Sequence, residues 1–321
     1  MRADSLFALR KEKAMSNKTI SGNGNKQYRD ALFKYIFGNE ERKQYTLELY
    51  NALNGTEYTD TSKIQYKTLE DVMYINYHND VACMIDSNLI NLWEEQSTWN
   101  PNMALRLLTY SISMWSNYLY STKQELTSRT LVKIPHVNCV VLYNGSDKEP
   151  ATRTVSINDN FLGERPKSAT PLEFEVMVYN INTKAGEKLL SKCRPLFEYS
   201  WVISKVQEYT EENKHKGMAY PESLTLGIKM ALRNIPKDYV LRNALLAKQE
   251  EVIQMLLTEF DAKRHDEIVF DNGFEEGSQQ EKKNSVVSFF NVGVAIETIA
   301  KALKLSEDAV KDILAEKENQ D

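Results

Sequence analysis

The chain has few of the residues that interrupt or cross-link a fold. It contains only 12 glycines, 8 prolines and 3 cysteines in 321 residues, against 17 tyrosines and 11 phenylalanines. This balance excludes a linker-rich or low-complexity protein and predicts an ordered globular one. Cys83, Cys139 and Cys193 are odd in number and each lies in an apolar segment. We therefore expect buried thiols rather than disulfides or a zinc site.

Long apolar runs are also missing. No stretch approaches the roughly 18 to 20 apolar residues that a membrane-spanning helix needs. Residues 1–27 are polar and locally basic, without the apolar centre of a signal peptide. The sequence therefore predicts a cytoplasmic protein with no membrane partner. We expect residues 1–27 to be a disordered extension, with a DNA-gripping arm as the alternative.

A basic excess is absent as well. The formal net charge is −5 at pH 7, whereas contacts with DNA phosphates need lysine and arginine. An acidic balance does not exclude a local basic groove. It requires the groove to be small, or the binding to depend on a metal ion.

The segment from 79 to 97 carries most of the functional information. Its sequence, NDVACMIDSNLINLWEEQS, reads as two apolar strands joined by a turn-forming cluster at 86–88, which predicts an antiparallel hairpin. Pairing about Ser87 sets Asp80 opposite Glu94. Directly opposed residues hold their Cβ atoms about 4.5 to 5.5 Å apart, so both carboxylates could bind one divalent cation.

The residues after Glu94 alternate between the two faces of the predicted strand. Gln96 shares the face of Glu94, and Glu95 points to the other side. Oxygen ligands of this kind suit Mg²⁺, or Mn²⁺ or Ca²⁺, and a metal held there suits phosphodiester hydrolysis. The alternative is that these carboxylates are solvated strand ends. A slip of one residue would instead pair Asp80 with Glu95.

The two strands, NDVACMID and LINLWEEQST, resemble the Asp…Glu-x-Gln active-site motif of the PD-(D/E)xK nuclease superfamily. The resemblance is to the Rpn branch of recombination-promoting nucleases, also described as transposases. It covers about residues 28–260, through the segments LELYNALNGTEY, NPNMALRLLTY, CVVLYNG and EFEVMVYNIN. It implies a restriction-endonuclease-like α/β fold, a mixed sheet flanked by helices and followed by a helical C-terminal region. It also implies a metal-dependent DNA endonuclease acting in recombination or transposition.

The resemblance assigns roles to individual residues. Asp80 and Glu94 become catalytic metal ligands, and Gln96 stands where the superfamily more commonly has a catalytic lysine. Water activation must then depend more on the metal. Arg106 lies ten residues past Gln96, where its fork-shaped donor could hold a substrate phosphate. The alternative for Arg106 is a surface ion pair, although the branch also shows an arginine followed by a tyrosine there.

The chain divides into five predicted segments. They are a disordered extension (1–27), a nuclease core (28–183), a helical region packed on the core (184–260), a charged linker (261–284) and a helical tail (285–321). Within the core we expect helices over 30–54 and strands at about 70–77, 80–86, 89–96, 138–144 and 173–182.

The tail reads as two helices, the second capped by Ser306. This pattern resembles a helix-turn-helix, but the second helix carries Glu307, Asp308 and Asp312 against Lys311 alone. Carboxylates facing phosphates would oppose DNA binding. We therefore interpret the tail as a docking or homo-oligomerisation unit.

Two other functional classes are compatible with the sequence. One is a catalytically degenerate DNA-binding or interaction protein that kept the fold without turnover. The other is a toxin-like phage-defence component that its helical tail keeps silent.

Overall fold

The structure is a computed structural model that describes residues 32–66, 80–85, 88–145, 149–182 and 184–318. The side chains of Asp80, of 316–318 and of most residues between 262 and 279 are not described. The predicted extension (1–27) and the predicted strand at 70–77 lie outside the described residues. The chain forms two compact units, Met1–Asp261 and Ala262–Asp321.

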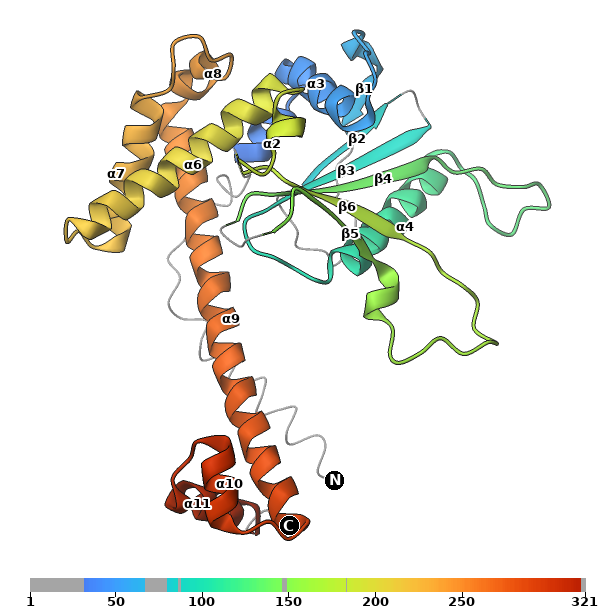
Figure 1. Ribbon diagram of the computed structural model, residues 1–321. Coiled ribbons are helices and arrows are strands. Elements are labelled where there is room, and N and C mark those ends of the chain that lie inside the picture. Colours follow the sequence, from blue (N-terminus) through green and yellow to red (C-terminus); the bar gives the residue numbers. More distant parts are fainter. Residues whose placement is uncertain (1–31, 67–79, 86–87, 146–148, 183, 319–321) are drawn as a thin grey trace. The chain divides into compact units, whose positions relative to one another are not determined.

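The described part of the first unit contains a mixed six-stranded sheet (Figure 1). The strand order is β1-β2-β3-β4-β6-β5, with parallel pairing of β3 with β4 and of β4 with β6 and antiparallel pairing elsewhere. The strands are β1 (Ile64–Tyr66), β2 (Asp80–Ile85), β3 (Leu89–Gln96), β4 (His136–Tyr143), β5 (Thr152–Ser156) and β6 (Glu175–Asn180). The predicted mixed α/β class is confirmed.

The predicted hairpin is present with the predicted register. Strands β2 and β3 pair antiparallel, with Asp80 opposite Glu94 and Ile85 opposite Leu89. Strand β3 then leads through helix α4 (Met103–Ser121) to the parallel strand β4. A parallel pair needs such a crossover, since a tight turn cannot join parallel strands.

Both faces of the sheet are buried, which explains the nearly continuous apolar runs of β2 and β4. Helix α4 covers one face, where it packs against side chains such as Leu92 and Val141. The other face packs against α2 (Leu32–Phe37), α3 (Lys43–Asn54) and the helices that follow β6. All three cysteines are buried free thiols, as expected.

The helices that follow β6 add a further layer to the first unit. They are α5 (Glu187–Leu190), α6 (Arg194–His215), α7 (Tyr220–Arg233), α8 (Arg242–Ala247) and the beginning of α9 (Gln249–Asn291). Pro195 stands in the first turn of α6, where proline loses no helical hydrogen bond. The helical region is interrupted just before this proline, between α5 and α6.

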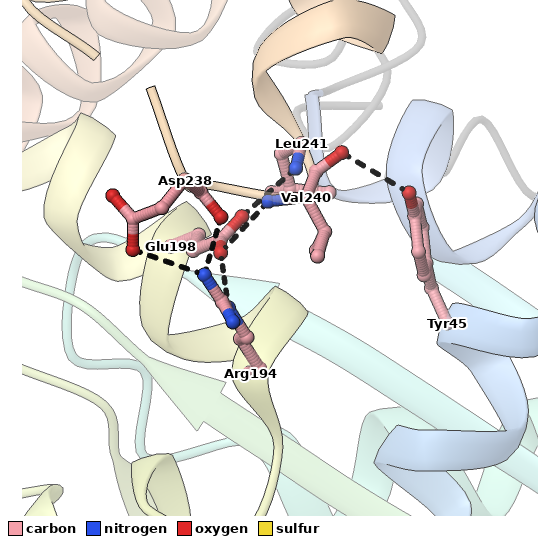
Figure 2. Close-up of polar contacts among 6 residues, drawn as sticks. All are labelled: Tyr45, Arg194, Glu198, Asp238, Val240 and Leu241. Atoms are coloured by element: carbon pink, nitrogen blue, oxygen red, sulfur yellow. Dashed lines mark hydrogen bonds and ion pairs between the residues drawn. The ribbon is translucent and has the colours of Figure 1, made fainter. Parts of the chain in front are cut away.

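A buried carboxylate holds α8 against α6 (Figure 2). Glu198 of α6 is fully buried and accepts hydrogen bonds from the backbone N–H groups of Val240, at 2.9 Å, and Leu241, at 2.8 Å. Arg194, one turn earlier, donates to the same carboxylate through Nε at 2.9 Å and also contacts Asp238. A buried charge is tolerated when it is paired and hydrogen-bonded in this way.

The second unit contains the end of α9, α10 (Ile296–Leu303) and α11 (Glu307–Glu318). The last two helices form the expected pair, and Ser306 Oγ accepts from the backbone N–H of Ala309 at 3.2 Å, which confirms the predicted cap. Lys304 ends α10 with φ at 55°, in the left-handed region that usually favours glycine.

The predicted charged linker at 261–284 is helical and lies within α9. Gly273 and Gly277 each cost about 1 kcal/mol in a helix. The glutamate, glutamine and lysine residues around them are good helix formers, and they outweigh that cost.

In the described part of the chain, no helix is long and apolar enough to cross a bilayer.

Candidate active site

Glu94 is the centre of the predicted site. It lies near the end of β3 and is 1% exposed. Leu92, two positions earlier, packs in the core beneath α4, so the alternation of the strand points Glu94 toward the same helix. A carboxylate buried there needs compensating donors, because an isolated buried charge is very unfavourable.

Two of the predicted site residues supply such donors. Gln96 Nε2 donates to Glu94 Oε1 at 2.8 Å, and Arg106 Nη2 lies 2.6 Å from the same oxygen. Gln96 shares the face of Glu94, as the period of two predicts. Arg106 lies in the first turn of α4, the helix that begins after the loop following β3. Three of the four predicted site residues are therefore in direct contact.

Tyr110 completes this contact network. Its hydroxyl accepts from Arg106 Nε at 2.7 Å, and the side chain is 1% exposed. Tyr110 was not predicted from the sequence as a site residue. Its spacing of four residues from Arg106 was the available signal, because side chains four apart lie side by side on a helix. Tyr110 orients the guanidinium, while the ion pair with Glu94 holds its other end.

Asp80 is described by its backbone alone. The ladder places it directly opposite Glu94. Among the described residues, no three His, Cys, Asp or Glu side chains cluster so that they could hold a metal ion. The Asp80 side chain is not among the described ones, so the pair of Asp80 and Glu94 as metal ligands stays a prediction. The oxygen donors of the site, carboxylate and amide, are of the kind that Mg²⁺ prefers.

Glu95 faces the opposite side of the sheet, as predicted, but it is not a solvated residue. It is 6% exposed and lies close enough to Tyr199 of α6 to act on its ionisation. Burial is the main cause that raises the pKa of Tyr199 well above its ordinary value, and the negative charges of Glu259 and Glu95 add to it. Asn144 Nδ2 donates to the Tyr199 hydroxyl at 3.3 Å. Glu95 therefore lies in the buried layer between the sheet and α6, away from Glu94.

The chain matches no protein-family model, and comparison with curated proteins and with solved structures gave no match either. The interpretation of the site rests on its residues and their geometry.

Proposed function

We propose that the protein is a metal-dependent DNA endonuclease that hydrolyses phosphodiester bonds, with the β2–β3 hairpin as its active site. The observation that carries the proposal is the contact of Glu94 with both Gln96 and Arg106, opposite Asp80 in the ladder. Gln96 of β3 and Arg106 of α4 both contact this one buried carboxylate. An association with recombination or transposition belongs to the same proposal.

A restriction-endonuclease-like fold, which is a narrower assignment than mixed α/β, fits this function. The antiparallel hairpin, the helical crossover and the parallel strand β4 are the elements expected of a restriction-endonuclease-like core. In such a core the carboxylates lie on rigid strands, which keeps their separation constant. We therefore include the restriction-endonuclease-like assignment in the proposal.

The residues fit a divalent ion. Asp80 and Glu94 would hold it through carboxylate oxygens, which suit Mg²⁺, Mn²⁺ or Ca²⁺. The ion supplies Lewis acidity, which activates water and offsets charge on the phosphate oxygens. Gln96 cannot accept a proton from water near neutral pH, because its amide has no basic site. Its role is to orient, and the hydrogen bond to Glu94 is one way in which it does so.

Arg106 would act on the substrate. Its guanidinium offers several donors in a plane, of which Nη2 is engaged by Glu94 and Nε by Tyr110. In this proposal a phosphate oxygen accepts from the same guanidinium, since the fork of an arginine binds more than one acceptor. Arg106 therefore holds the scissile phosphate beside Glu94.

One observation favours a second function. The ion pair already compensates Glu94, so a divalent ion that binds Oε1 would compete with Arg106. A degenerate protein that binds DNA without turnover would keep this pair permanently. A toxin-like phage-defence role is a further alternative for the same site, and growth arrest on deletion of the tail would indicate it.

Nicking of supercoiled plasmid by the full chain tests the proposal. We expect nicking with Mg²⁺ or Mn²⁺, none with EDTA, and none from Asp80→Asn or Glu94→Gln. Glu175→Gln is the matched control, because Glu175 is an exposed glutamate at the start of β6. Equal nicking by wild type and both site variants would show that the activity lies elsewhere. DNA binding without nicking under every metal condition would favour the degenerate protein.

A further inference from the structure

A tryptophan and an arginine are stacked at the end of the sheet that carries Glu94. The guanidinium carbon of Arg153 lies 4.4 Å from the centroid of the Trp99 ring. Trp99 follows β3 by three residues, and Arg153 is the second residue of β5. Cation–π contacts of this kind stabilise the pair and hold the guanidinium over the ring.

Both side chains belong to the face of the sheet that α4 covers. Trp99 packs against the core of that face, and its ring meets Tyr143 edge-on with centroids 6.4 Å apart. Val155, two positions after Arg153, is buried in the same core. The alternation of β5 therefore puts Arg153 on this face as well.

The ladder relates this pair to the candidate active site. Glu94 is opposite Val141, Val141 opposite Val178, and Val178 opposite Arg153. Three strand spacings of about 4.8 Å therefore separate the backbones of Glu94 and Arg153, or about 14 Å. Gln96 and Tyr143 are also directly opposed. The carboxyl ends of the parallel strands, where open α/β sheets bind ligands, lie at the same edge.

The stacked pair is held in place and still accessible. Glu149 pairs with Arg153 Nη1 at 3.2 Å, and the side chain of Arg153 is 48% exposed. The loop that carries Trp99 is tied to the turn after β5, because Asn160 Nδ2 donates to Asn102 Oδ1 at 3.2 Å. Glu149 compensates the charge of the guanidinium at its edge. The guanidinium of Arg153 is therefore the group of this pair that a ligand can reach.

We infer that Trp99 and Arg153 form a stacking subsite for one unpaired base of a nucleic-acid strand, with the Arg153 guanidinium as the layer that the base contacts. Bases stack on aromatic rings and on guanidinium planes wherever they are splayed out of a duplex. A paired base inside an intact duplex cannot reach such a layer. The subsite therefore selects single-stranded or locally unpaired nucleic acid. The inference rests on the proposed function in one respect: the bound strand would be the one that is cleaved at Glu94.

Binding of a fluorescein-labelled oligothymidylate to the full chain in EDTA tests the subsite. The sharpest variant is Arg153→Lys, which keeps the charge and removes the stacking plane. We expect it to weaken binding roughly 5- to 150-fold, as loss of a base-stacking side chain does. Trp99→Leu should weaken binding similarly. Arg233→Ala, which removes an exposed arginine at the end of α7, is the control and should bind as wild type does.

An abasic oligonucleotide separates base stacking from phosphate contact. We expect wild type to bind it more weakly than oligothymidylate, and Arg153→Lys to bind it as well as wild type does. Equal wild-type affinity for the two ligands would overturn the subsite, as would unchanged binding by Arg153→Lys. Nicking by wild type together with either result would leave the nuclease proposal standing. Base-dependent binding by a protein that never nicks would support the subsite and remove the nuclease proposal.

Discussion

Arg106 Nη2 and Glu94 Oε1 lie 2.6 Å apart, with the Glu94 side chain 2% exposed and the Arg106 side chain 20% exposed. This buried pair links α4 to β3. Removing the arginine from such a pair costs about 3 kcal/mol, because the Glu94 carboxylate stays buried without its counter-charge.

Arg106→Met should therefore lower the free energy of unfolding by about 3 kcal/mol, measured by urea denaturation. In the proposed site it should also tighten Mn²⁺ binding in calorimetry, since the competitor for Glu94 is gone, and weaken DNA binding. The double variant Arg106→Met with Glu94→Gln should recover part of the lost stability. Weaker Mn²⁺ binding in a folded Arg106→Met protein would contradict the competition between the metal and the guanidinium.

Gln96 should behave as a positioning residue. Gln96→Ala removes the hydrogen bond to Glu94, so we expect a slower nicking rate with Mn²⁺ binding retained. Gln96→Lys should be tolerated, because an ammonium group can also donate to Glu94. Lysine is also the more common residue at this place in the superfamily that the sequence resembles. Loss of Mn²⁺ binding in Gln96→Ala would instead make the amide an essential ligand.

Glu198 should be a strong determinant of stability without any effect on the candidate site. Glu198→Ala leaves the buried backbone N–H of Leu241 without its acceptor, and we expect a loss of about 3 kcal/mol or more. Glu198→Gln keeps one oxygen acceptor and should lose less. The comparison is urea denaturation at neutral pH, with the exposed Glu208→Gln on the same helix as the control. Equal midpoints for Glu198→Ala and the control would show that the network contributes nothing.

The three buried thiols should not react with thiol reagents in the folded protein, and they should ionise only at high pH. Burial raises the pKa of Cys83 and Cys193 to about 12 and that of Cys139 to about 11. A thiol reagent should therefore find no reactive group at pH 8 in the native protein and three after unfolding in urea. Because the folded pKa values are raised, the neutral thiols stabilise the fold below the unfolded pKa near 8.5. That stability should be lost as the pH rises from about 9 toward 12.

Truncation after residue 284 should remove the whole apolar core of the second unit. That core consists of Val286, Ile299, Ala300 and Val310. If the tail is a docking or oligomerisation unit, light scattering should show a changed oligomeric state while DNA affinity is kept. A particle mass that falls only with chain length, together with lost DNA binding, would favour the helix-turn-helix interpretation.

Local patterns were sufficient for the elements that have strong turn and capping signals. The turn at 86–88 predicted the hairpin and its register, Gly55 ends α3 with φ at 66°, and Ser306 caps α11. Strand β1 was missed, because three residues carry too little periodicity to be recognised. The helix over 261–284 was not predicted, because Gly273 and Gly277 favour a linker. The residues around them are good helix formers, and the segment is helical.

The sequence by itself determined the chemistry available: the Asp80 and Glu94 pairing, the face shared by Gln96, and the class of the fold. Only the tertiary structure decided that the guanidinium of Arg106 meets Glu94, that Glu95 is buried beside Tyr199, and that Arg153 stacks on Trp99. Period and turn length are local properties, which neighbouring residues fix. Contacts between a strand and a helix, or between β5 and the loop after β3, depend on how the layers pack, and packing is not encoded within any single segment.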